Sequence, residues 1–318
     1  MSAERPERIT GSADALLQRI EWTVLRRLDG ILQGQWRTLF RGAGLDLADL
    51  REYQHHDDVR YIDWSVTARL QVPHVREFIE DRESTAWFLL DLSPSIDFGS
   101  HNTRKRDVLA GFVAAMARLL TRHGNRVGAM LYSTKVDTVV RAGAGRQHVL
   151  QLLHRLQTRP KLQAVKETSL GELLGAAAGM LQRRSMVFVV SDFISSPGWE
   201  KHLAQLARRH DVVAVRLVDP LEQALPDMGL LTMQDAETGE RLLVDTQDAG
   251  FRRRFEKLAR EREEALMESF ASAGTDVLEL STAEPLIDTL LRLCEMRRQR
   301  VRAASAAQLP AHLKRAAA

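Results

Sequence analysis

The chain has very little cysteine and few aromatic residues. Cys294 is the single cysteine among 318 residues, so the chain cannot form an internal disulfide. Its apolar helical surroundings predict a buried core thiol rather than a nucleophile. Aromatic side chains make up 6% of the residues and, except at Trp36 and Phe40, do not alternate with basic ones. This pattern does not favour nucleic-acid binding.

Long apolar runs are also missing. No stretch approaches the roughly 20 apolar residues that a membrane-spanning helix needs. Residues 1–11 are polar and charged, unlike a signal peptide. Basic and acidic residues nearly balance and leave a formal net charge of +3, which gives little general attraction to polyanions. We therefore expect a soluble, cytoplasmic protein without a membrane span.

What the sequence does contain is a regular alternation of short apolar runs with amphipathic segments. Continuous apolar runs are typical of strands that are buried on both faces of a parallel sheet. Strands are predicted at 85–91, 126–132, 136–141, 186–191, 211–218 and 276–280, and helices at 104–121, 147–157, 169–181, 196–209, 251–270 and 285–296. This order predicts an α/β fold with a doubly wound, mostly parallel, Rossmann-like sheet over residues 84–300.

Residues 1–83 are less regular. Apolar spacing predicts a helix over 13–32, with a possible break near Gly30, followed by strand-like pieces at 51–53 and 74–78. We expect an irregular, strand-containing region packed on the sheet, because its aromatic residues need burial: Trp36, Phe40, Tyr53, Trp64 and Phe78. Residues 301–318 form a basic tail that is typical of a frayed or flexible end.

Oxygen-bearing side chains follow the predicted strands at one end of the sheet. Asp91, Ser93 and Ser95 come directly after the strand at 85–91, Asp192 follows the strand at 186–191, and Thr168 precedes the helix at 169–181. Ligands bind at the carboxyl ends of parallel strands. Two carboxylates and three hydroxyls are hard oxygen donors, so they suit one Mg²⁺ or Mn²⁺ with open coordination positions.

Each of these residues also has a purely structural interpretation. Ser169 with Glu172 forms the sequence pattern of a capping box, so Thr168 could serve only the start of the helix. Asp192 could accept backbone N–H groups in its turn, and Ser93 and Ser95 could cap a short turn. A transition-metal site at 55–58, or a second magnesium at Asp57, Asp58 and Asp63, is a further alternative to turn caps and ion pairs.

The pattern Asp91-x-Ser93-x-Ser95, then Thr168, then Asp192 resembles the metal-ion-dependent adhesion site of von Willebrand factor A-type domains. Residues further upstream resemble the domain of unknown function 58 family, which pairs a short N-terminal region with such a domain. The matching segments are Leu50-Arg51-Glu52-Tyr53, Asp57-Asp58-Val59-Arg60, Ile62-Asp63-Trp64, Thr67-Ala68-Arg69, Val75-Arg76-Glu77-Phe78, Gly124-Asn125-Arg126-Val127-Gly128 and Ser191-Asp192-Phe193.

This resemblance implies a non-enzymatic binding module that works with a MoxR-type AAA+ ATPase in the assembly or maturation of protein complexes. Asp91, Ser93, Ser95 and Thr168 would hold the cation directly or through water, and Asp192 would lie in its first or second shell. One position would stay open for an Asp or Glu of a client protein. His55-His56 replaces the Pro-Gly common in the family, so that turn is expected to differ.

A magnesium-dependent hydrolase, such as a phosphatase or nuclease acting through Asp91 and Asp192, is the alternative. Such an enzyme needs a general base or a nucleophile near the metal. The three loops contain no histidine, and the chain has no H-E-x-x-H, G-x-S-x-G or Walker A motif. The residues therefore favour binding over catalysis.

Overall fold

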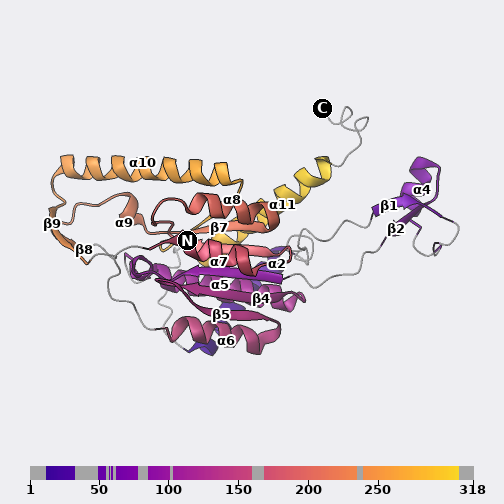
Figure 1. Cartoon of the computed structure of the whole chain (residues 1–318), viewed down its shortest axis with the longest axis horizontal. Coiled ribbons are helices and arrows are strands. Elements are labelled where there is room, and N and C mark those ends of the chain that lie inside the picture. Colours follow the sequence, from indigo (N-terminus) through magenta and orange to yellow (C-terminus); the bar gives the residue numbers. More distant parts are fainter. Residues whose placement is uncertain are drawn as a thin grey trace.

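The described part of the chain is built around a six-stranded sheet between two layers of helices (Figure 1). The computed structural model describes residues 12–32, 49–54, 57, 59, 62–77, 85–100, 103–159, 168–234 and 239–307. The strand order is β10-β7-β6-β3-β4-β5, and all pairings are parallel except that of β5 with β4. The strands are β3 (Thr85–Asp91), β4 (Arg126–Tyr132), β5 (Val136–Gly143), β6 (Met186–Ser191), β7 (Asp211–Val218) and β10 (Asp276–Ser281). The predicted doubly wound, mostly parallel sheet is confirmed.

The central strands are continuous apolar runs because they are covered on both faces. Every residue of β6 is buried. In β3, Phe88 and Leu90 contribute to the core on one face of the sheet, and Leu89 contributes to the core on the other. This alternation follows from the two-residue period of a strand.

One face is covered by α5 (Lys105–Arg122), α6 (Gly145–Gln157), α11 (Leu286–Ala307) and the N-terminal helix. That helix consists of α1 (Ala13–Ile20), a π-helical segment at Glu21–Leu25 and α2 (Arg26–Leu32). It continues through Gly30, where the sequence indicated a possible break. Leu17 and Leu28 are fully buried in the same core as α5, so this predicted N-terminal helix packs on the sheet. Ala and Gly residues line much of α5 and allow close contact with the strands.

The opposite face is covered by α7 (Leu170–Met180), α8 (Trp199–Arg209) and α10 (Ala249–Ala273). An aromatic cluster joins this layer. The ring centroids of Phe193 and Phe270 are 4.8 Å apart in an edge-to-face arrangement, and that of Trp199 lies 5.2 Å from Phe193. Such contacts fix the loop that carries Phe193, which directly follows the end of β6.

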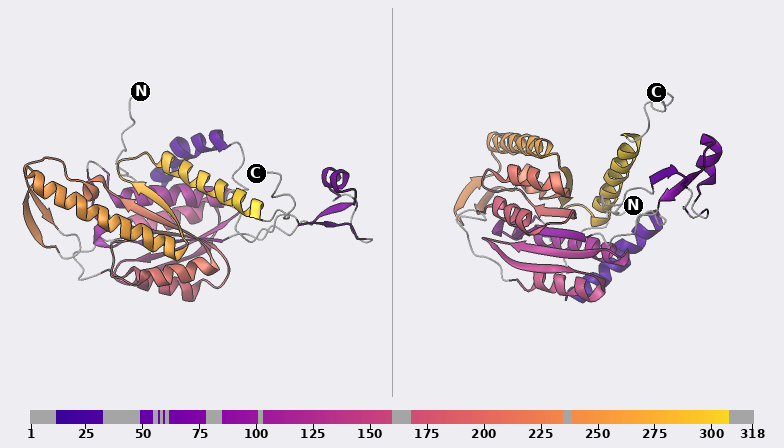
Figure 2. Two further views of the ribbon diagram at one scale, coloured as in Figure 1. Left: turned by 90° about the horizontal axis from the view of Figure 1, so that it is seen from above. Right: turned by 45° about the vertical axis from the view of Figure 1, so that its right-hand side comes forward.

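Two small antiparallel pairs lie outside the sheet. β1 (Asp49–Glu52) and β2 (His74–Glu77), with α4 (Trp64–Leu70) between them, lie apart from the sheet in Figures 1 and 2. β8 (Leu230–Gln234) and β9 (Arg241–Asp245) form an antiparallel hairpin near α10. A 3-10 turn, η3 (Pro94–Asp97), follows β3, and the short helix α9 (Pro220–Gln223) follows β7.

The expected burial of the N-terminal aromatic residues is wrong for Trp64. This side chain is 70% exposed, because it lies on the first turn of α4 rather than in a strand facing the sheet. Asp63 caps α4 by accepting the N–H groups of Ser65 and Val66. Asp57 caps a turn, as expected, by accepting the N–H of Gln54. Trp36, Phe40 and Phe78 lie outside the described residues.

The C-terminal helix is longer than predicted. The sequence predicts its end at residue 296 and a tail from 301, whereas α11 continues to Ala307. Residues 308–318 of the predicted tail lie outside the described residues. Among the helices that the structure describes, none combines the length and the apolar character required to cross a membrane.

Candidate metal centre

Asp91 is the last residue of β3, and its carboxylate is completely buried. Its Oδ1 accepts the Ser93 N–H at 3.0 Å, and its Oδ2 accepts the Ser191 hydroxyl at 2.7 Å. Leu90 pairs with Val190 in the neighbouring strand, so the register brings the ends of β3 and β6 together. Asp91 and the residues that follow β6 therefore lie at one site, as predicted.

The two serine hydroxyls after β3 are also brought together. Ser93 and Ser95 are buried, and their Oγ atoms lie 3.1 Å apart. Ser93 occupies the N-cap position of η3, but its side chain makes no capping hydrogen bond. The Ser93 hydroxyl therefore does not cap the turn. Both hydroxyl oxygens keep lone pairs that could bind a cation.

Thr168 is fully buried and is tied to the loop after β6 through its backbone. Its carbonyl oxygen accepts the Ser195 hydroxyl at 2.9 Å and the Ser196 N–H at 3.1 Å. Within the described part of the chain, its own hydroxyl has no hydrogen-bond partner. A buried hydroxyl without a partner is costly, so this Oγ1 has the character expected of a ligand that lacks its cation.

The capping-box interpretation of Ser169 with Glu172 is not supported. The Ser169 side chain makes no capping hydrogen bond. The start of α7 is held instead from neighbouring elements, because the Leu170 N–H donates to Ser195 Oγ at 2.8 Å and the Ser169 N–H to the Tyr132 hydroxyl oxygen at 3.1 Å. Thr168 is thus positioned by β4 and by the Asp192 loop.

Asp192 follows β6, and both of its carboxylate oxygens are engaged. Oδ1 accepts the Ile194 N–H at 3.1 Å, which is the structural role considered from the sequence. Oδ2 accepts Lys105 Nζ at 3.0 Å. The next residue, Phe193, has a φ of 58°, a left-handed conformation that is uncommon for a non-glycine residue and typical of functional loops. The aromatic cluster with Trp199 and Phe270 holds it there.

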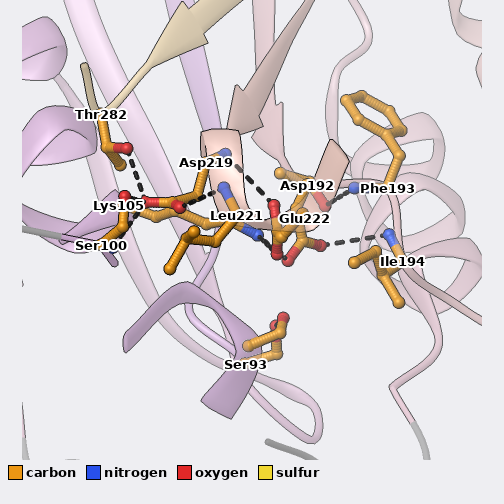
Figure 3. A network of polar contacts seen from close by, with 12 residues as sticks. Ser93, Ser100, Lys105, Asp192, Phe193, Ile194, Asp219, Leu221, Glu222 and Thr282 are labelled. Carbon is orange, nitrogen blue, oxygen red and sulfur yellow. Dashed lines mark hydrogen bonds and ion pairs between the residues drawn. The ribbon is translucent and has the colours of Figure 1, made fainter. Parts of the chain in front are cut away.

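Sequence reasoning missed three residues of this site. Lys105, at the start of α5, is fully buried and places its ammonium group between Asp192 and Glu222, 2.5 Å from Glu222 Oε1 (Figure 3). Ser191, whose hydroxyl binds Asp91, ends β6. These contacts join positions 87–117 residues apart, so no local pattern announces them.

The electrostatics follow from burial and proximity. Burial, and then the nearby charge of Asp192, raise the pKa of Asp91 to about 6, although its hydrogen bonds oppose this. Burial also raises the pKa of Glu222, with Lys105 acting in the opposite direction. For Lys105, burial acts to lower the pKa, but the carboxylates of Asp192 and Glu222 outweigh it, so the pKa is raised and the ammonium form is favoured.

The donor set fits a hard divalent cation. Carboxyl groups outnumber basic groups around this site, because Asp91, Asp192 and Glu222 face the single ammonium group of Lys105. One Mg²⁺ or Mn²⁺ would offset this excess of negative charge. The described residues contain no cluster of three or more His, Cys, Asp or Glu side chains suited to a metal, so the hydroxyls are essential to this site. The alternative sites near residues 55–58 fall largely outside the described residues.

The model of a protein family described as "Protein of unknown function DUF58" matches residues 49–265, which is more than half of the chain. The chain belongs to the DUF58 family. An uncharacterized protein of Mycobacterium tuberculosis is 34% identical over 299 residues, which cover 92% of this chain and 94% of that protein. The family resemblance drawn from the sequence is therefore confirmed.

Two solved structures are similar to about two thirds of this chain. An aerotolerance-related membrane protein from Bacteroides fragilis is 12% identical, with a TM-score of 0.45, and the match covers 68% of this chain and 99% of that one. The SpRpn10 VWA domain is 13% identical, with a TM-score of 0.37, and the match covers 66% of this chain and 95% of that one.

Proposed function

We propose that this DUF58 protein is a divalent-cation-dependent protein-binding module. The observation that carries the proposal is the Thr168 hydroxyl, which is fully buried, has no hydrogen-bond partner among the described residues, and lies in a loop tied by Ser195 to the loop after β6. A bound Mg²⁺ or Mn²⁺ would supply a Lewis-acidic position for an Asp or Glu carboxylate of a client protein. Asp91 provides the anionic ligand, and the three hydroxyls provide neutral ones.

The residues of this chain position those ligands. Ser191 and the Ser93 N–H hold the Asp91 carboxylate in one orientation. Ser195 ties the Thr168 loop to the loop after β6. A site made of few charged ligands leaves the cation able to attract a further carboxylate, which is the property that a carboxylate-binding module needs.

In the wider role that we propose, the protein acts in the cytoplasm as an adaptor or substrate selector for a MoxR-type AAA+ ATPase during protein-complex assembly or maturation. The family resemblance supports this role. We propose no catalysis by the chain itself. Lys105, the buried amine at this edge, is paired with two carboxylates and is therefore poorly suited to act as a general base.

The test is affinity capture from native cytosol with Mg²⁺ or with EDTA, followed by identification of the eluted proteins. We expect Mg²⁺-dependent recovery of an AAA+ ATPase or of acidic client segments, and its loss in Asp91→Ala. Asp97→Asn is the matched control, because it changes an acid of η3 that is paired with Arg106 and is not a candidate ligand. Equal capture with EDTA contradicts the proposal. Phosphate or nucleotide release by pure protein, lost in Asp91→Ala, would support the hydrolase instead.

A further inference from the structure

Lys105 is a basic residue at this edge, and no part of its side chain reaches solvent. Lysine is rarely fully buried unless its charge is paired. Here it is paired with two carboxylates, Asp192 Oδ2 at 3.0 Å and Glu222 Oε1 at 2.5 Å. A lysine at the first position of a helix does not need two carboxylate partners for the helix to form. We therefore looked for the reason for this pairing in the candidate metal centre.

The hydrogen bonds of Asp192 provide it. Oδ1 is engaged by the Ile194 N–H, and Oδ2 by Lys105. A cation bound to Asp91, Ser93, Ser95 and Thr168 could take Asp192 as a direct ligand only by displacing or sharing one of these donors. The ammonium group is the competitor for Oδ2, because it carries a full positive charge and already binds that oxygen at 3.0 Å.

We propose that Lys105 is a built-in counter-cation that keeps Asp192 out of direct contact with the bound divalent ion. Lys105 is thus a positioning residue of the candidate metal centre, and this inference rests on the proposed function. Asp192 then contributes its negative charge at a distance, while Asp91 is the one carboxylate among the described residues that binds the ion directly. The price of this arrangement is a weaker intrinsic affinity for the ion.

The consequence concerns the client. An ion with one direct carboxylate ligand keeps more of its positive charge than an ion with two, so it attracts an external Asp or Glu more strongly. Freeing Asp192 should therefore tighten binding of the ion. The position left for the client should at the same time become less attractive to a carboxylate.

The test is a titration of the chain with Mn²⁺ alone. The concentration of free Mn²⁺ is measured by electron paramagnetic resonance at each step. The informative variant is the double substitution Lys105→Met with Glu222→Gln. It removes one positive and one negative charge, so the net charge of the edge is unchanged while Asp192 loses its ammonium partner. We expect Mn²⁺ to bind at least about tenfold more tightly than in the wild type. An argument from net charge alone predicts no change.

Adding Asp192→Asn to that double variant provides the control. If Asp192 becomes a ligand when it is freed, this third substitution should remove the gain in affinity. The melting temperature gives a second readout, because Mn²⁺ should raise it more in the double variant than in the wild type. A purely structural lysine would lower the melting temperature without changing its response to Mn²⁺.

The outcomes separate this inference from the proposed function. A wild-type chain that binds no Mn²⁺ overturns both. A wild-type chain that binds Mn²⁺, with a folded double variant of unchanged or weaker affinity, overturns the role of Lys105 alone. If the double variant does not fold, the single variant Lys105→Met takes its place. Circular dichroism then checks that this variant is folded. The same rise in Mn²⁺ affinity is expected there, and an unchanged affinity again contradicts the inference.

Discussion

Asp91 and Asp219 occupy similar places and have different surroundings. Asp91 ends β3 and Asp219 directly follows β7, at the same edge of the sheet, and both are completely buried. Asp219 accepts four hydrogen bonds, from the N–H and hydroxyl of Ser100, the Leu221 N–H and the Thr282 hydroxyl. Burial acts to raise the pKa of Asp219, but these donors outweigh it and lower the pKa.

Asp91 has fewer donors and a negative neighbour. The Ser93 N–H donates to it at 3.0 Å and the Ser191 hydroxyl at 2.7 Å, and burial with the charge of Asp192 raises its pKa to about 6. The protein itself completes the surroundings of Asp219, whereas the charge of Asp91 is left to be stabilised by something else. This difference distinguishes a carboxylate with a structural role from one suited to bind a cation.

The largest expected effect on stability is that of Asp219→Ala. This substitution leaves the donors of Ser100, Thr282 and Leu221 buried without an acceptor, so the free energy of unfolding should fall by about 3–4 kcal/mol. Urea denaturation followed by circular dichroism measures it. Asp91→Ala in EDTA should cost less than about 1 kcal/mol. Equal losses of stability in the two variants would contradict the different roles assigned to Asp219 and Asp91.

The second largest difference between Asp91 and Asp219 should be in how each carboxyl makes stability depend on pH. A carboxyl whose folded-state pKa is raised from 3.8 to about 6 takes up a proton on folding between these values, so it removes stability as the pH rises through this window. Above pH 6, the cost to the metal-free protein reaches up to about 3 kcal/mol. Asp91→Asn should therefore raise stability in EDTA at pH 7 by about 2 kcal/mol, and the gain should vanish near pH 4. A gain that is independent of pH would contradict this assignment.

The sheet, and the place of the aspartates at the ends of its strands, could be predicted from the sequence. Buried strands appear as apolar runs, such as 186–191, and parallel strands place Asp91 and Asp192 at one edge of the sheet. The contacts that distinguish Asp91 from Asp219 are not readable in this way. Ser100, Lys105 and Thr282 reach their partners across 63–119 positions, so only the folded chain shows them.

Other features were hidden for local reasons. A lysine at the first position of a helix normally predicts exposure, which conceals the burial of Lys105. The left-handed conformation of Phe193 is imposed by packing against Trp199 and Phe270, not by its residue type. Trp64 shows the opposite error, since an aromatic side chain expected to be buried is exposed on α4.

Single donors to the two carboxylates should have intermediate effects. Thr282→Val removes one of the hydrogen bonds of Asp219 and should lower the free energy of unfolding by about 1 kcal/mol at pH 7. Ser191→Ala removes a donor of Asp91 and should raise the pKa of that carboxyl above about 6. Urea denaturation of Thr282→Val checks the first expectation, and carboxyl titration of Ser191→Ala by NMR in EDTA checks the second. An unchanged Asp91 titration in Ser191→Ala would contradict the second.

The smallest effect on stability should come from Thr168→Val, which replaces a hydroxyl by a methyl group of similar size. Because this hydroxyl has no partner among the described residues, stability in EDTA should be unchanged or raised by up to about 1 kcal/mol. Affinity for Mn²⁺, measured by calorimetric titration, should nevertheless fall. A variant that loses stability and keeps its affinity would show that the hydroxyl serves the fold.

The most direct measurement is anomalous X-ray diffraction from crystals of the full-length protein grown with Mn²⁺. The account predicts one manganese peak within coordination distance of Asp91, Ser93, Ser95 and Thr168, with Asp192 still bound to Lys105. A structure at saturating Mn²⁺ with no peak at this edge of the sheet would contradict the central claim.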